Sequence, residues 1–253
     1  SEMCIRDRRY TYPQDKDARV MIDLKIPSEY DYQIVEGSVK QTGARRIEGF
    51  SKQLSKNVWS ADADQNYTIY FVIEFNKDIK KFGGWHDHTL WETDTMTAHY
   101  PQRFGCYAEF DTTDHPEVMV RSGISYVDMA GASNNLSNEI TEPFGWNFEA
   151  VHKHQSDSWN NILNRVRIYS NDYREKVRFY TNLYRAFCRN TFSDADRRWV
   201  DAAGNIQKLD DPDAVALGCD AFWNTFWNLN QVWNLIAPEW SSRWVKSQLA
   251  MYD

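Results

Sequence analysis

The chain has 253 residues, of which 42% are hydrophobic and 26% charged, so it is long enough for one large or two modest globular domains. Its 29 basic and 36 acidic side chains give a formal net charge of -7, which offers no basic stripe for a phosphate backbone and argues against nucleic acid as a partner. No apolar run approaches the roughly 20 residues of a membrane-spanning helix, and the charged start at residues 1–9 is unlike a secretory leader, so we expect no membrane partner.

Aromatic residues are frequent: 11 Trp, 14 Tyr and 13 Phe make up 15% of the chain. Flat aromatic rings suit both large cores and the apolar faces of sugar rings, and the core is the prediction for most of them. The four cysteines contain no CxxC pair, which argues against a zinc knuckle or a redox motif and predicts small buried hydrophobic residues. They are Cys4, Cys106, Cys188 and Cys219.

Residues 9–129 show a strand pattern with no intervening helical period. Short runs rich in β-branched and aromatic residues predict strands at residues 19–24, 32–40, 67–75, 104–110 and 118–127. The run 67–75 is the clearest and lies between Asn66 and Asn76. Several strands in succession indicate an antiparallel β-sandwich.

The hydrophobic period becomes helical after Gly145, where Asn147 is a suitable N-cap residue. Residues 165–169 alternate like a short strand, and Asp172 with Glu175 predicts a capping box for a further helix. The faces predicted for these two helices contain Phe148, Val151, Gln155, Trp159 and Ile162 in the first, and Tyr173, Val177, Tyr180, Tyr184 and Phe187 in the second. An irregular acidic stretch follows at residues 193–213.

Two further helices are predicted at the end of the chain, separated by Pro238, which is tolerated in the first turn of a helix. Their predicted inward residues are Phe222, Phe226, Leu229, Trp233 and Ile236 in the first, and Trp240, Trp244, Val245 and Leu249 in the second, which runs to Asp253. Two such antiparallel helices leave a second apolar face without neighbours, so we expect the chain to end in an unfinished layer.

Three local groups carry possible chemistry. His86-Asp87-His88 offers ligands for a metal ion, but two histidines and one carboxylate after Gly83-Gly84 favour an exposed polar loop. Asp194 and Asp196 resemble a calcium loop only in part, because Arg198 stands where a ligand is needed, so a solvated turn is predicted. No spacing identifies a catalytic acid and base, and we predict neither a catalytic nor a metal-binding residue from these groups.

Residues 218–231 place amide side chains beside aromatic rings, with Trp223 and Asn224 at the centre. Amides bind hydroxyl groups and indole rings stack on pyranose rings, which indicates sugar binding. The alternative is structural: the polar residues satisfy a helix end while the tryptophans pack. The sequence alone leaves both interpretations open.

Four stretches in the same order resemble glycoside hydrolase family 92, the calcium-dependent exo-acting α-mannosidases, over about residues 45–253. Residues 123–127 (GISYV) and the following 131–136 (GASNNL) resemble the family's GISFV and GARANL motifs. Residues 179–184 (FYTNLY) resemble FYTALYH, and residues 192–196 (FSDAD) resemble FSDxDG. Trp223-Asn224-Thr225 falls where the family has Trp-Asp-Thr.

This resemblance implies a multi-domain β plus α architecture: an antiparallel β-sandwich at residues 1–145, a helical linker at 146–192 and the first helices of an (α/α)6 barrel at 193–253. It also implies an inverting exo-α-mannosidase acting on terminal α-mannosides of glycans, with Trp223 and Asn224 as substrate-binding residues. Calcium is the implied cofactor. The family's catalytic acid, base and calcium ligands lie further on, so we expect them downstream of Asp253 and expect this chain, as a truncated fragment, to be inactive alone.

Two departures from the family pattern leave alternatives open. Asn224 replaces a sugar-contacting aspartate, and Arg197 replaces the glycine of FSDxDG. A non-catalytic carbohydrate-binding paralogue or a glycosidase with altered sugar preference is therefore an alternative, as is an unrelated β-sandwich enzyme with His86 and His88 as metal ligands. By resemblance alone the protein is periplasmic or extracellular. Residues 1–8 have no counterpart in the family, so we expect the start of the sandwich domain to be incomplete.

Overall fold

The computed structural model describes residues 5–14, 17–25, 32–55, 64–86, 88–99, 104–188, 190–218 and 225–252. These residues form two compact units that meet in the sequence between Trp146 and Asn147. In the described part of the chain, no helix is long and apolar enough to cross a membrane.

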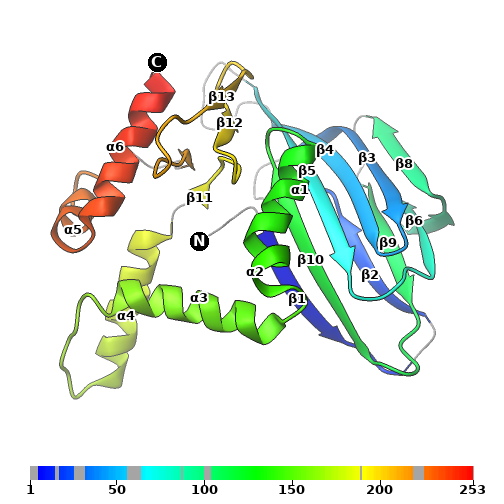
Figure 1. Cartoon of the computed structure of the whole chain (residues 1–253), viewed down its shortest axis with the longest axis horizontal. Helices are drawn as coiled ribbons and strands as arrows, with labels where there is room; N and C mark the ends of the chain where they lie inside the picture. The colour runs from blue at the N-terminus through cyan, green and yellow to red at the C-terminus, as the bar shows by residue number, and fades with distance from the viewer. Residues whose placement is uncertain are drawn as a thin grey trace. The chain divides into compact units, whose positions relative to one another are not determined.

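The first unit is a sandwich of two antiparallel sheets (Figure 1). A six-stranded sheet has the order β1-β10-β5-β4-β3-β8 and a four-stranded sheet the order β2-β9-β6-β7. The strands are β1 (Ile5–Thr11), β2 (Ala18–Asp23), β3 (Gln33–Gly43), β4 (Arg46–Ser55), β5 (Gln65–Phe75), β6 (Lys81–His86), β7 (Thr89–Glu92), β8 (Thr95–His99), β9 (Phe104–Phe110) and β10 (Glu117–Ser125). The predicted order of an antiparallel sandwich followed by helices is confirmed.

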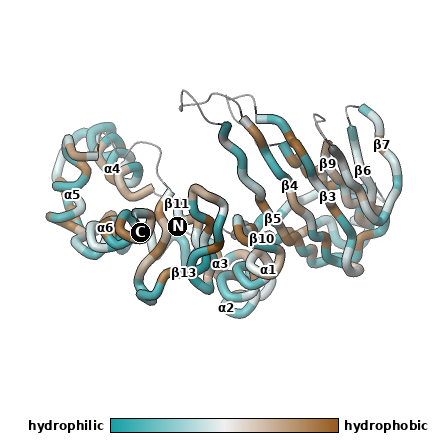
Figure 2. Tube along the Cα trace, turned by 90° about the horizontal axis from the view of Figure 1, so that it is seen from above, coloured by the Kyte–Doolittle hydropathy of each residue, from teal (hydrophilic) through white to brown (hydrophobic). Residues whose placement is uncertain are grey.

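Side chains from both sheets fill the space between them, because alternate residues of each strand point to the same face. Phe75 of β5 and Phe110 of β9 are fully buried, with ring centroids 4.9 Å apart. In Figure 2, hydrophobic and hydrophilic segments alternate along β4 and β5. Because of this alternation, strands could be predicted from the sequence.

Short helices cover the outer face of the six-stranded sheet: α1 (Met129–Leu136), the π-helix η1 (Ser137–Thr141) and α2 (Glu142–Phe144). Asp128 caps α1 by accepting a hydrogen bond from the Gly131 amide at 2.6 Å. A Cβ atom on Gly123 of β10 would lie 2.8 Å from the Leu136 Cβ, so glycine permits the close approach of α1 to the sheet (Figure 1). The GASNNL motif, residues 131–136, lies within α1.

Several strand predictions are confirmed and several strands were not predicted. The runs 19–24, 32–40, 67–75, 104–110 and 118–127 correspond to β2, β3, β5, β9 and β10. Ile5–Arg8, for which no strand was predicted, are part of β1 and pair with β10. The charged sequence of this edge strand has almost no apolar alternation, and backbone pairing with β10 makes it a strand.

The second unit contains the helices α3 (Phe148–Leu163), α4 (Tyr173–Phe187), α5 (Leu229–Ile236) and α6 (Pro238–Tyr252). Two short strand pairs lie between α4 and α5: β11 (Asn190–Thr191) with β14 (Leu217–Gly218), and β12 (Arg198–Val200) with β13 (Ile206–Lys208). The core joins α4 to α5 through Leu183, Phe187 and Trp233, and the Trp233 Nε1 donates to the Ala186 carbonyl at 3.0 Å.

The predicted helix starts are confirmed. The Asn147 Oδ1 accepts a hydrogen bond from the Ala150 amide at 3.0 Å, and Pro238 begins α6. Asp172 caps α4 by accepting from the Arg174 amide at 2.8 Å. The capping box differs from the prediction, because Glu175 accepts from the Ser170 hydroxyl at 2.7 Å and that hydroxyl accepts from the Asp172 amide.

Other predictions for this unit are wrong. Residues 165–169 form no strand, and Tyr169 is 95% exposed. The predicted face of α4 holds only in part: Phe187 is buried and Tyr180 packs against the same core, but Tyr173, Val177 and Tyr184 are exposed. Leu183, outside the predicted face, is buried. Phe226, Val245 and Leu249 are exposed as well. Periodicity located the helices but not the neighbours that decide which apolar residues are covered.

Candidate functional site

The acidic stretch predicted as irregular contains the β12–β13 hairpin. Asp201 organises its turn, because the Asp201 Oδ1 accepts hydrogen bonds from the amides of Ala203 at 2.9 Å and Asn205 at 2.8 Å. Gly204 supplies the left-handed backbone conformation that the turn requires, with φ of 86°. The hairpin is therefore specified locally.

The turn before this hairpin contains residues 192–197, which resemble the FSDxDG motif. Arg197 has φ of 71°, which is the left-handed region that favours glycine. Its amide donates to the Asp194 carbonyl and its Nη1 donates to the Asp210 carbonyl, both at 2.8 Å. The predicted turn is confirmed, but it is not wholly solvated, because Asp194 is 4% exposed.

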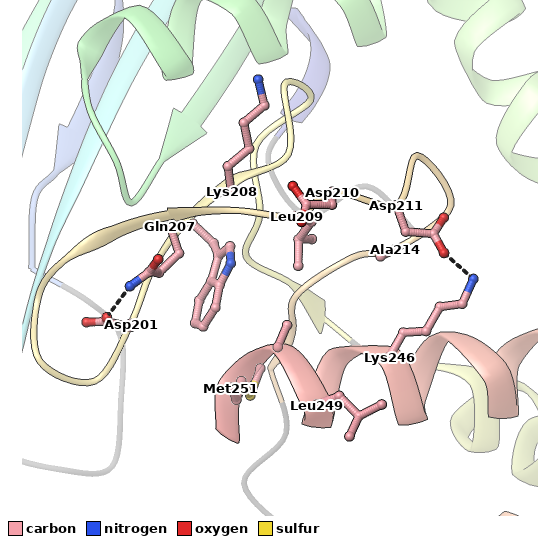
Figure 3. A pocket seen from close by; sticks show the side chains of 12 residues that line it. Asp201, Gln207, Lys208, Leu209, Asp210, Asp211, Ala214, Lys246, Leu249 and Met251 are labelled. Carbon is pink, nitrogen blue, oxygen red and sulfur yellow. Dashed lines mark hydrogen bonds and ion pairs between the residues drawn. The ribbon is translucent and has the colours of Figure 1, made fainter. Parts of the chain in front are cut away.

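A pocket of about 550 Å³ lies between the β12–β13 hairpin, the loop after it and α6 (Figure 3). Its floor is the apolar cluster of Trp199, Leu209 and Ala214, which are all buried. Polar and charged side chains surround this floor: Asp201, Gln207, Lys208, Asp210, Asp211 and Lys246. An apolar base with a hydrogen-bonding rim suits a small hydroxyl-rich ligand.

Two carboxylates of this pocket are held in the ionised form. The pKa of Asp201 is lowered chiefly by the hydrogen bond from the Gln207 Nε2, which lies 2.9 Å from the Asp201 Oδ2. The pKa of Asp211 is lowered chiefly by its hydrogen bond with Lys246. A general acid needs the opposite shift, so these carboxylates are suited to accepting hydrogen bonds from hydroxyl groups and not to donating a proton.

Calcium does not fit the described residues. They contain no group of three or more His, Cys, Asp or Glu side chains that could hold a metal ion. The two Asp196 oxygens accept from the Arg198 amide at 3.1 Å and its Nε at 2.7 Å. Asp201 is likewise committed to its own hairpin. We therefore derive no catalytic step through a metal ion on this chain.

The predicted sugar-binding residues Trp223 and Asn224 lie outside the described residues, so the structure does not relate them to the pocket. Their described neighbours show a structural role for one amide: the Gln231 Nε2 donates to the Phe226 carbonyl at 2.9 Å. Thr225 is 3% exposed. The structural interpretation therefore applies to Gln231, and the sugar-binding hypothesis for Trp223 and Asn224 stays a prediction.

The two histidines singled out in the sequence lie at the β6–β7 turn. His86 is the last residue of β6 and is paired with Thr89, whereas His88 is exposed. Asp87 lies outside the described residues. Within the described ranges neither histidine belongs to a three-ligand group, and the exposed position of His88 agrees with a polar turn.

Comparison with known families assigns both units. The model for the glycosyl hydrolase family 92 N-terminal domain matches residues 8–125, and the model for the catalytic domain of the same family matches residues 131–253. The chain belongs to glycoside hydrolase family 92. A search of curated proteins gives no match.

Solved structures of family 92 share the fold. A family 92 α-mannosidase from Bacteroides thetaiotaomicron matches with a TM-score of 0.82 and 22% identity over 100% of this chain, and its complex with mannoimidazole matches with a TM-score of 0.81. An inverting family 92 mannosidase from Bacteroides thetaiotaomicron VPI-5482 matches with a TM-score of 0.76 and 19% identity over 96% of this chain. The 253-residue chain spans 32% of the length of the first two solved chains and 31% of the third.

Sequence patterns did not reveal the pocket. Lys246 follows Asp211 by 35 residues, and the two meet only because α6 packs beside the loop after β13. No local motif signals such a contact. The aspartate-rich composition of residues 193–213 was the only available signal, and it indicated a turn.

Proposed function

We propose that the complete protein is an inverting, exo-acting α-mannosidase that removes terminal α-mannosides from glycans. The observation that carries this proposal is the match of both family 92 domain models, in order, to one chain. The fold similarity to mannosidases, one of them in complex with mannoimidazole, supports mannosides as the substrate class. The proposal extends to a periplasmic or extracellular location, which rests on the family alone.

In this proposal residues 1–145 are the sandwich domain, 146–192 the helical linker and 193–253 the beginning of an (α/α)6 barrel. Trp223 stacks on the glycone, and Asn224 hydrogen-bonds its hydroxyl groups. An amide donates as well as accepts hydrogen bonds, unlike a carboxylate, so Asn224 would shift the preference among sugars that differ in one hydroxyl group.

Inversion requires a carboxylic acid that protonates the leaving oxygen and a carboxylate that activates water, roughly 6.5–9.5 Å apart. The described pocket offers carboxylates whose pKa values are lowered, which does not suit the acid. The family resemblance implies that the acid, the base and the calcium ligands lie in sequence after Asp253, and on that basis we expect the 253-residue chain to be inactive alone.

A second candidate is a carbohydrate-binding paralogue without catalysis. It is favoured by two departures at family positions, Asn224 and Arg197. Binding of mannosides with no turnover by the complete protein would establish this alternative.

The test is hydrolysis of an aryl α-mannoside by the complete reading frame, with and without a chelator, with the released sugar followed by proton NMR. We expect chelator-sensitive release of β-mannose as the first product. Trp223→Ala should lower kcat/KM at least tenfold, whereas Trp227→Ala, at a side chain that is 67% exposed, should leave it unchanged. Release of α-mannose first, or no turnover of any mannoside, would contradict the proposal.

A further inference from the structure

The four-stranded sheet β2-β9-β6-β7 has an outer face directed away from the sandwich core. Phe82 of β6 and Cys106 of β9 belong to the core, so the residues that alternate with them lie outside. Trp85 pairs with Gly105 on one side and with Leu90 on the other. Met21 pairs with Tyr107 one row further along the strands.

Glycine provides the surface on which the Trp85 ring rests. A Cβ atom on Gly105 would lie 2.5 Å from the Trp85 Cε2 and would also collide with its Nε1. The indole therefore lies across the backbone of β9, and its Nε1 donates to the Ile22 carbonyl at 3.1 Å. Contact with glycine and this hydrogen bond fix the orientation of the ring before any ligand arrives.

A second ring on the same face is covered. A Cβ atom on Gly83 would lie 2.7 Å from Tyr107, so this ring lies across β6. The Arg19 guanidinium lies 5.1 Å above the Tyr107 ring centroid, and Tyr107 is 3% exposed. Trp85 is only partly buried. Leu90, its partner on β7, is 43% exposed, and Met21, one row further along on β2, is 49% exposed. Among these residues, Trp85 is the one that offers an aromatic ring to a ligand.

Two ion pairs neutralise four of the charged side chains on this face, and Asp23 of β2, paired with Gly105 in the sheet register, is a further carboxylate on it. Arg19 pairs with Glu109, and Lys81 pairs with Glu92. Because Arg19 and Lys81 are already paired with carboxylates, this face suits a neutral ligand better than a polyanion. The exposed apolar strip of three side chains is also small beside the roughly 800 Å² per partner that a stable protein interface buries.

From this geometry we propose that the outer face of β2-β9-β6-β7 binds a neutral glycan by stacking one pyranose ring on Trp85. The C–H face of the sugar lies on the indole, with Met21 and Leu90 extending the contact, and the surrounding polar side chains accept its hydroxyl groups. This site is built wholly from the sandwich unit. The choice of α-mannan as the glycan rests on the proposed function.

The test is affinity electrophoresis of the 253-residue chain in native gels that contain α-mannan, with cellulose- and xylan-derived polysaccharides in parallel gels. We expect α-mannan to retard the wild-type chain, and Trp85→Ala to weaken this retardation at least fivefold. Met21→Glu should weaken it as well, and because Met21 is 49% exposed this variant keeps the core intact. Trp91→Ala is the matched control: its indole lies over Gly84 in the same hairpin, on the opposite side of the sheet, and retardation should persist.

Wild-type retardation in Trp85→Ala and Met21→Glu, or no retardation by any polysaccharide, would overturn the proposal. A dimer that Met21→Glu converts to a monomer in size-exclusion chromatography would overturn it too, because the face would then bind a second copy. Retardation by another neutral glycan, but not by α-mannan, would support glycan binding at Trp85. It would count against α-mannan as the glycan that binds there. If the complete protein does not hydrolyse mannosides, the proposed function fails, but glycan binding by the outer face of β2-β9-β6-β7 is still tested by the gels.

Discussion

The Arg197 guanidinium donates a hydrogen bond to the Asp210 carbonyl at 2.8 Å, while the Arg197 backbone has φ of 71°. A side chain with a Cβ atom is disfavoured by roughly 1 kcal/mol in this left-handed region. The hydrogen bond offsets part of that cost and fastens the turn before β12 to the loop beside the pocket. Arginine thus stands here in a backbone conformation that glycine adopts without strain.

Two variants separate these contributions. Arg197→Ala keeps the strained backbone and loses the hydrogen bond, so we expect it to lower the free energy of unfolding by about 0.5–1 kcal/mol. Arg197→Gly loses the same bond but relieves the strain, and it should be more stable than Arg197→Ala by about 1 kcal/mol. Urea denaturation measures both, and an alanine variant as stable as the glycine variant would contradict the strain argument.

Glu74 joins two arginines beneath α1. Its Oε1 accepts from the Arg46 Nη1 at 2.7 Å, and its Oε2 accepts from the Arg121 Nε at 2.8 Å, with the Arg121 side chain only 10% exposed. Glu74→Ala leaves this arginine buried without its carboxylate, so we expect a loss of about 2–3 kcal/mol in unfolding free energy.

The exposed pair of Arg45 and Asp78 provides the control for Glu74. Its side chains are 56% and 68% exposed, so Asp78→Ala should cost less than about 0.5 kcal/mol. Equal losses for the two variants in thermal denaturation would show that burial of the Glu74 cluster is unimportant.

Asp7 of β1 is paired with Arg121 in the sheet register, and its two carboxylate oxygens are buried. Burial raises the pKa of Asp7 above 3.8, although the amide of Arg8 and the charge of Arg121 act in the other direction. The folded state therefore binds the proton more tightly than the unfolded state. Ionisation of Asp7 therefore destabilises the fold progressively as pH rises from 3.8 to the raised pKa, and the loss is complete above that pKa.

Asp7→Asn removes this ionisation. We expect the variant to exceed the wild type in stability at pH 7 by about 1 kcal/mol or less, because nearby solvent and Arg121 screen the effect, and to lose this advantage near pH 3. Thermal melts between pH 3 and pH 7 measure the difference. A constant difference across this range would refute the assignment to ionisation, and Asp78→Asn, at a side chain that is 68% exposed, is the control.

Trp233 and Trp227 lie near one another in sequence but differ in burial. Trp233 is 1% exposed and hydrogen-bonds α4, whereas Trp227 is 67% exposed. Trp233→Ala should lower the unfolding free energy of the helical unit by about 3–5 kcal/mol, and Trp227→Ala by less than about 0.5 kcal/mol. Far-UV circular dichroism during urea denaturation tests this, and similar losses for both variants would contradict the described packing.

The sequence determined the elements whose signals are local. Alternating apolar residues specify β5 and β9, and Asn147 and Pro238 specify the starts of α3 and α6. The ordered motifs were sufficient to indicate the family. Each of these signals depends on neighbouring residues in the chain, which is why one sequence was enough.

Only the tertiary structure decided which apolar residues are covered and which polar residues meet. It made Ile5–Thr11 a strand by pairing it with β10, left Val245 and Leu249 exposed on α6, and brought Lys246 to Asp211 beside the pocket. It also laid Trp85 on Gly105. These relationships join segments far apart in the sequence, and they are set by packing and backbone pairing that no local pattern records.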